Sequence, residues 1–157
     1  MTQIDVFEKF KELANNKIAL LWGEPLTGKT SFSFFLANKF QNVIFIKIDR
    51  NYTAEDIKAN VKSSNLKIFE INDIQDLINV IKLLKKVRPQ NALIIVDSIS
   101  SIYDMCAEQY MDNRPLMMNK YRDLIGMLVT TLATLKQDKN TIVLIGHART
   151  NWKTGEL

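Results

Sequence analysis

The feature that most constrains the fold is a glycine-containing segment between an apolar run and an amphipathic pattern. Residues 23–30 satisfy the pattern G-x-x-x-x-G-K-[ST] in full. The apolar run at 17–22 predicts a buried strand before this segment. After it, Phe32, Phe35 and Leu36 fall on one face of a predicted helix. A strand, this turn and a helix in that order are typical of a loop that binds nucleotide phosphates, rather than of an ordinary glycine-containing turn.

The residue types in this segment suit phosphate and magnesium chemistry. Gly23 and Gly28 allow consecutive backbone N–H groups to point into one concavity at the start of a helix, where anions bind well. Lys29 would bring its ammonium group to the β- and γ-phosphates, and Thr30 would offer a hydroxyl to Mg²⁺. We therefore predict that a nucleotide and Mg²⁺ bind to residues Gly23, Glu24, Pro25, Leu26, Thr27, Gly28, Lys29, Thr30 and Ser31.

Three polar residues end or follow other predicted strands. Asp97 closes the apolar run 92–96, and a carboxylate there can hold the water shell of Mg²⁺ opposite Thr30. Asp49 ends the strand 43–49 and could orient and activate water. For both, the alternative is a turn or capping residue. His147, the only histidine, follows the strand 141–145. It is either a sensor of the γ-phosphate or a structural hydrogen-bond donor.

The strands at 17–22, 43–49, 92–97 and 141–145 alternate with helical patterns. This alternation predicts an α/β fold with three layers: a mainly parallel sheet with helices on both faces. The length of 157 residues suits a single domain. Other expected elements are a helix at 5–13, a helix after the phosphate loop, a helix capped by Thr53, a short edge strand at 66–69, a helix capped by Asn72 or Asp73, a loop at 99–114 and a helix from Pro115.

Composition excludes several classes of protein. With 46% hydrophobic residues and few Gly and Pro, the chain is not disordered. The longest apolar runs, 18–22 and 92–96, are too short to span a membrane, and no secretory signal begins the sequence. A single cysteine, Cys106, fits a reducing, cytoplasmic compartment. The net charge of +4 favours anionic partners only weakly.

The phosphate loop, the strand ending at Asp97 and the polar residue after strand 141–145 together resemble the RecA/RadA-like ATPase core. Residues 96–103, Val-Asp-Ser-Ile-Ser-Ser-Ile-Tyr, are similar to the archaeal RadA-paralogue type. His147, where recombinases usually have Gln, is more similar to the small phage ATPases of this core that are linked to single-strand annealing. The resemblance spans roughly residues 17–150.

This resemblance implies a Mg²⁺-dependent ATPase that acts in DNA recombination, repair or single-stranded DNA processing. Lys29, Asp49, Asp97 and His147 would be its catalytic residues. The strand 141–146 would lie between 17–22 and 92–97, with 43–49 beyond. The family has Glu where an ungapped match places Asp49, and a shift of one or two residues would place Arg50 or Asn51 there. Because Asp is one methylene shorter than Glu, hydrolysis is expected to be either slow or absent.

The resemblance also implies partners. Arg149, Trp152 and Lys153 correspond to a DNA-contacting loop, and an aromatic ring between basic side chains suits single-stranded DNA. A frayed polar terminus is the alternative. The family continues with further strands, one of which pairs outside the strand at 17–22. This strand is therefore expected at a sheet edge, in a truncated core or under cover from residues 5–14 or a second subunit, and on this ground we expect self-association.

Two other functions remain open from the sequence. A small-molecule or nucleoside kinase shares the phosphate loop but needs a lid with several arginines, and the expected loop 99–114 offers only Arg114. A module that binds nucleotide without hydrolysis fits the shorter carboxylate at 49. The preferred base, the geometry of any assembly and the identity of an arginine acting between subunits are not specified by the sequence.

Overall fold

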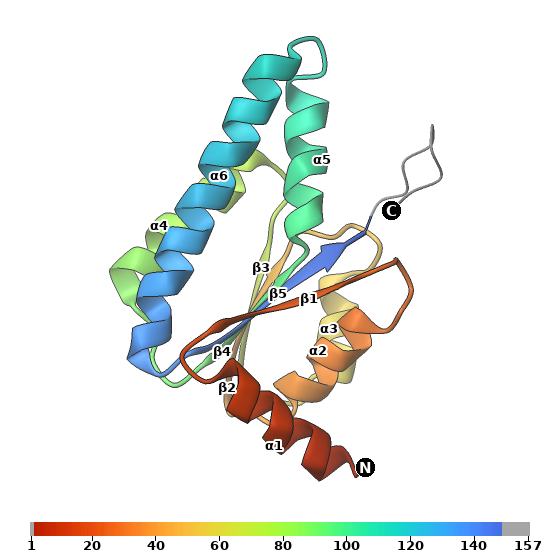
Figure 1. The fold of residues 1–157 in the computed structure, drawn as a ribbon, viewed down its shortest axis with the longest axis vertical. Coiled ribbons are helices and arrows are strands. Elements are labelled where there is room, and N and C mark those ends of the chain that lie inside the picture. Colours follow the sequence, from red (N-terminus) through yellow and green to blue (C-terminus); the bar gives the residue numbers. More distant parts are fainter. Residues whose placement is uncertain (1, 149–157) are drawn as a thin grey trace.

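The computed structural model describes residues 2–148, in which helices and strands alternate along the chain (Figure 1). The elements are α1 (Gln3–Ala14), β1 (Ile18–Gly23), α2 (Lys29–Ala37), β2 (Asn42–Lys47), α3 (Ala54–Asn60), β3 (Asn65–Glu70), α4 (Ile74–Val87), β4 (Leu93–Asp97), α5 (Ile99–Gln109), α6 (Arg114–Leu135), a short 3-10 turn (Lys136–Asp138) and β5 (Thr141–His147). The predicted α/β class is confirmed.

The strands of this part of the chain form one five-stranded sheet in the order β1-β5-β4-β2-β3, and every pairing is parallel. The expected position of β5 between β1 and β4, with β2 beyond, is therefore confirmed, as is the edge position of β3. In this register Gly23 lies opposite His147, and Asp97 lies opposite both Ile145 and Lys47. Parallel pairing thus brings the carboxyl ends of all five strands to the same end of the sheet.

The two faces of the sheet bury alternate residues of the central strands. Even-numbered residues such as Ile94 and Val96 pack with α4, α5 and α6, whereas odd-numbered ones such as Phe45 and Ile95 pack with α2 and α3. Figure 1 shows these two helical layers on opposite sides of the strands. Because β4 is buried along its whole length, its sequence is a continuous apolar run that ends only at Asp97.

Side-chain caps set the starts of several helices. Thr53 and Asp56 form a capping box at α3, and the side chain of Asp73 accepts a hydrogen bond from the N–H of Asp76 at α4. Asp73, rather than Asn72, is therefore the cap of α4. At α2 no side chain caps the helix, because the phosphate loop supplies its first turn.

The expected loop at 99–114 is wrong. Residues Ile99–Gln109 form α5, whose N-cap is Ser98. Ile102, Met105 and Cys106 lie three and four residues apart and are buried against the sheet and α6. The polar residues between them obscured this spacing. The kinase alternative was disfavoured because a loop here would lack the arginines of a lid. Since most of these residues form a helix, that argument no longer applies.

β1 occupies one edge of the sheet, as expected. Among residues 2–148 no strand pairs with its outer side. Helix α1 does not cover this edge; its Phe7 and Phe10 rings pack instead against Phe40 and Phe32, at 6.0 and 5.9 Å between ring centres. Two large side chains of β1, Leu20 and Trp22, stay 53% and 59% exposed.

No helix within residues 2–148 has the length and apolar character needed to cross a membrane.

The burial of α5 predicts the effect of shortening its core residues. Ile102 is fully buried, whereas Leu83 on α4 is 41% exposed. Replacing Ile102 with Ala should lower the free energy of unfolding by about 2–5 kcal/mol. The matched change Leu83→Ala removes the same number of carbon atoms from the surface and should cost much less. Urea denaturation measures both, and equal losses would contradict the packing of α5.

Candidate phosphate-binding and carboxylate site

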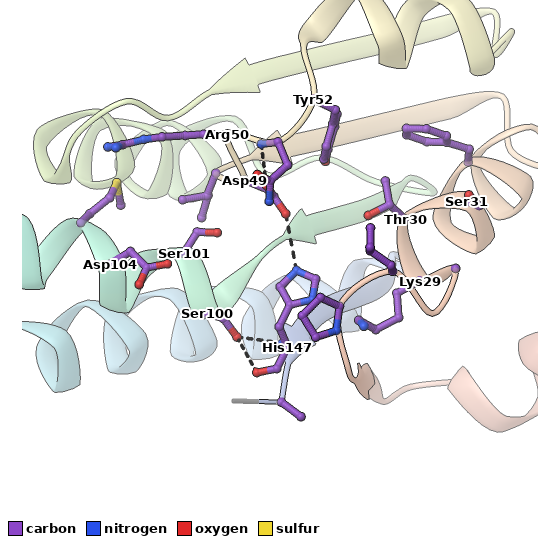
Figure 2. A pocket seen from close by; sticks show the side chains of 18 of the residues that line it. Lys29, Thr30, Ser31, Asp49, Arg50, Tyr52, Ser100, Ser101, Asp104 and His147 are labelled. Carbon is purple, nitrogen blue, oxygen red and sulfur yellow. Dashed lines mark hydrogen bonds and ion pairs between the residues drawn. The ribbon is translucent and has the colours of Figure 1, made fainter. Parts of the chain in front are cut away.

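A cleft of about 750 Å³ lies at the carboxyl ends of the strands (Figure 2). Its walls come from the phosphate loop, from residues 48–52 after β2, from the start of α5 and from the end of β5. Six of the predicted nucleotide-binding residues line it: Pro25, Leu26, Gly28, Lys29, Thr30 and Ser31. Gly23 and Glu24 instead line an adjacent hollow, and Thr27 lines neither.

The conformation of the loop before α2 depends on Gly28 and on hydrogen bonds from Lys29. Of its two glycines only Gly28 has a positive φ, of 88°, so this position favours glycine while Gly23 does not require it. The Lys29 ammonium group folds back onto the loop and donates hydrogen bonds to the carbonyl oxygens of Gly23 and Glu24 and to the hydroxyl of Thr27. The Lys29 donors that are expected to bind phosphate oxygens are therefore hydrogen-bonded to oxygens of the loop.

The Asp97 carboxylate is fully buried behind two residues that line the cleft, Thr30 and Tyr52. Its Oδ2 accepts hydrogen bonds from the hydroxyls of Thr30 and Tyr52, each at 2.8 Å. Its Oδ1 is buried and has no hydrogen-bond donor among the described residues. Burial raises the pKa of Asp97, and the hydrogen bonds from Thr30 and Tyr52 partly oppose this rise. An unpaired buried carboxylate oxygen beside a threonine hydroxyl is a donor set that fits Mg²⁺.

Tyr52 is a site residue that the sequence did not single out. Burial and the neighbouring Asp97 carboxylate raise its pKa well above the usual value, so the phenol keeps the proton that it donates. Its ring packs edge-on against Phe34 and Phe45, which fixes the hydroxyl in place. The only sequence signal was a turn at 51–53, in which a phenol follows the carboxylate of Asp49 by three residues.

Asp49 lies two residues past the end of β2 rather than at the end of the strand. Its N–H donates to the Asp97 carbonyl at 2.9 Å, and its Oδ1 accepts a hydrogen bond from the N–H of Asn51 at 2.8 Å. Its Oδ2 lies 3.5 Å from Nε2 of His147. One oxygen of Asp49 thus forms the expected turn, while the other lies beside His147.

Arg50 does not take the place of Asp49. Its guanidinium forms an ion pair with Glu108 of α5 at 2.9 Å. Figure 2 shows the Arg50 side chain extended away from His147, whereas Asp49 points toward it. Among the positions considered for the family's glutamate, Asp49 is therefore the one that faces His147.

His147 is positioned through its backbone. Its N–H donates to Oγ of Ser100 at 2.8 Å, which ties the end of β5 to α5. Neither ring nitrogen has a hydrogen-bond partner within residues 2–148. The nearest carboxylate to the ring is that of Asp49, whose Oδ2 lies 3.5 Å from Nε2. Arg149, Trp152 and Lys153, the candidates for DNA contact, lie outside the described residues.

Comparisons with known proteins agree with this geometry. A family model described as an AAA domain matches residues 15–156, which is most of the chain. The chain belongs to this family. A search of curated proteins found no match. Among solved structures, the crystal structure of the RadB recombinase is similar with a TM-score of 0.63 and 19% identity, over 90% of this chain and 67% of that one. The fold is therefore RecA-like, and the family and fold are those of P-loop ATPases.

Burial of the Asp97 carboxylate predicts how the free energy of unfolding changes with pH, measured in EDTA so that no metal ion is bound. Because burial raises the pKa of Asp97 above 3.8 in the folded state, the folded protein binds this proton more tightly than the unfolded chain. The stabilising contribution is thus present at low pH and is lost as pH rises through the raised pKa. Asp97→Asn should therefore denature at higher urea than wild type at pH 7, and the difference should shrink toward pH 3.8.

The control for this measurement is Asp123→Asn on the exposed face of α6, which should denature like wild type at each pH. An Asp97→Asn protein that is less stable than wild type at pH 7 would contradict the assignment of a disfavoured buried charge.

Proposed function

We propose that this protein is a Mg²⁺-dependent ATPase of the RecA-like type that acts on DNA in recombination, repair or single-stranded DNA processing. The observation that carries the proposal is the hydrogen bond of 2.8 Å between Thr30 of the phosphate loop and Asp97 of β4. It joins the buried Asp97 to Thr30, which lines the same cleft as Asp49 and His147.

Nucleotide binding is assigned to the phosphate loop and the start of α2. The backbone N–H groups there are available to the phosphates, and the helix N-terminus favours their negative charge. Lys29 would exchange its bonds to loop oxygens for bonds to the β- and γ-phosphates. Thr30 and Asp97 would hold Mg²⁺, Asp97 through water. The metal would neutralise charge that builds up on the phosphates.

Hydrolysis is assigned to Asp49 and His147. Because the N–H of Asn51 holds Oδ1 of Asp49, Oδ2 is the atom available to orient water and accept its proton. The His147 ring, which is without a hydrogen bond to any described residue, is free to donate one to the γ-phosphate. The contact between Oδ2 and the imidazole, at 3.5 Å, would then loosen when nucleotide binds.

The DNA part of the proposal has separate support. It comes from the similarity of residues 96–103 to the archaeal RadA-paralogue type, of His147 to the phage annealing ATPases, and of the fold to the RadB recombinase. The basic and aromatic residues Arg149, Trp152 and Lys153 would contact single-stranded DNA.

The direct test is ATP hydrolysis with and without single-stranded DNA, together with ATP binding. Wild type should hydrolyse ATP severalfold faster with DNA. Asp49→Asn should keep its ATP affinity within about twofold and lose about 10²–10⁴-fold in rate, which is the usual contribution of a general base. Lys29→Ala should lose ATP binding, because the ammonium group that reaches the phosphates is gone.

Asp123→Asn on the surface of α6 is the control, and its rate should equal that of wild type. Unchanged turnover in Asp49→Asn would remove Asp49 from the mechanism. Tight ATP binding without turnover in wild type would favour a nucleotide-binding module instead of an ATPase.

We also propose that the protein self-associates through the β1 edge. Leu20 and Trp22 expose apolar surface beside a strand that no described residue pairs on its outer side, and such an edge is prone to pairing with a second copy. Sedimentation velocity should detect dimers or larger species. Leu20→Glu should reduce them, whereas Leu83→Glu, also at an exposed leucine, should not. A monomer at all accessible concentrations would contradict this proposal.

A further inference from the structure

Three metal-ligating side chains from three neighbouring strand ends meet in the cleft. Asp49, Asp97 and His147 each offer one ligand atom, and these atoms all lie within 4.8 Å of one another. Asp49 follows β2, Asp97 ends β4 and His147 ends β5, so the arrangement depends on the parallel register of the central strands. Figure 2 shows Asp49 and His147 facing each other across this space.

Unpaired polar atoms are concentrated at this cluster. Asp97 is fully buried, and its Oδ1 lacks any hydrogen-bond partner within the described chain. Both ring nitrogens of His147 are also buried there without a hydrogen bond. Buried polar atoms without partners are rare and costly, so their convergence needs an explanation. A cation that accepts lone pairs from Oδ1 of Asp97 and from one ring nitrogen of His147 explains these two atoms.

The charges around the cluster point to a cation. Two carboxylates lie beside an imidazole, while nearby basic side chains are engaged elsewhere. Lys29 is bound to the oxygens of its own loop, Arg50 pairs with Glu108, and the Lys47 ammonium lies 5.4 Å from the centre of the Tyr52 ring. A divalent cation would balance both carboxylates at once.

We propose that Asp49, Asp97 and His147 directly bind a divalent transition-metal cation, of which Mn²⁺ is the representative, in the absence of nucleotide. This goes beyond the proposed ATPase, whose Mg²⁺ is assigned to Thr30, to water and to the nucleotide. The His147 imidazole indicates which class of metal the site would bind. Carboxylates suit Mg²⁺, Ca²⁺ and Mn²⁺, whereas imidazole suits transition metals, and Mg²⁺ prefers to keep oxygen ligands and water.

The spacing is close to what such an ion requires. Bonds of about 2.0–2.2 Å to nitrogen and oxygen keep any two ligand atoms within about 4.4 Å of each other. The 3.5 Å between Nε2 of His147 and Oδ2 of Asp49 already satisfies this limit. The widest separation allowed by the cluster, 4.8 Å, needs only a small inward movement of side chains. The two hydrogen bonds to Oδ2 of Asp97 leave Oδ1 as its ligand atom.

The test uses Mn²⁺ alone, titrated into the full chain without nucleotide and followed by calorimetry and electron paramagnetic resonance. One Mn²⁺ should bind per chain, and pulsed resonance should detect nitrogen coupling from an imidazole. Because His147 is the only histidine in the sequence, such coupling assigns the ligand without ambiguity. Labelling with ¹⁵N-histidine should change the coupling accordingly.

Variants separate this site from the ATPase. His147→Gln should abolish the nitrogen coupling, and both His147→Gln and Asp49→Asn should raise the Kd for Mn²⁺ by about tenfold or more, since even losses beyond the ligands cost 10–100-fold. Mg²⁺ affinity should hardly change in His147→Gln. Lys29→Ala should bind Mn²⁺ like wild type while failing to bind ATP, and Asp123→Asn should behave like wild type in both measurements.

Two results would overturn the proposal: bound Mn²⁺ without nitrogen coupling in wild type, or a Kd for Mn²⁺ that is the same in His147→Gln and Asp49→Asn as in wild type. Circular dichroism of each variant establishes that it is folded. Loss of ATPase activity in Asp49→Asn with normal Mn²⁺ binding would support the proposed function and refute the metal site, so the two proposals fail separately.

Discussion

The site depends on the parallel pairing of β4 with β2 on one side and β5 on the other. At the end of β4, the Asp97 carbonyl accepts hydrogen bonds from the N–H groups of both Ile48 and Asp49, at 2.7 and 2.9 Å. This fixes the chain after β2 relative to β4. The side chain of the same residue binds Thr30 and Tyr52. Asp97 therefore joins the start of α2, the segment after β2 and Tyr52 at one point.

The Lys29 ammonium group and the cluster behind the cleft differ in how their polar atoms are paired. Lys29 donates hydrogen bonds to oxygens of its own loop. The cluster differs, because Oδ1 of Asp97 and the His147 ring have no hydrogen-bond partners in the described chain. In the proposed function, phosphates would displace the existing bonds of Lys29, whereas in the proposed metal site a cation would supply contacts that the cluster lacks.

The sequence predicted the sheet better than it predicted the site. The apolar runs located the strands, the resemblance implied their order, and that order is confirmed. Helix α5 was missed because Ser100, Ser101 and Asp104 interrupt its apolar pattern, although Ser98 was available as a cap. Tyr52 was missed because its partner, Asp97, is 45 residues away and only the pairing of β2 with β4 joins them. Local patterns reveal strands and caps, whereas contacts across strands need the register.

The turn after β2 depends on the length of the Asp49 side chain. Its Oδ1 reaches the N–H of Asn51 because an aspartate is short enough to fold back over two residues. A glutamate, one methylene longer, would reach farther toward His147 but is not matched to this two-residue turn. The short side chain at position 49 thus suits the turn, while ring contacts with Phe34 and Phe45 hold the Tyr52 phenol beside Asp97.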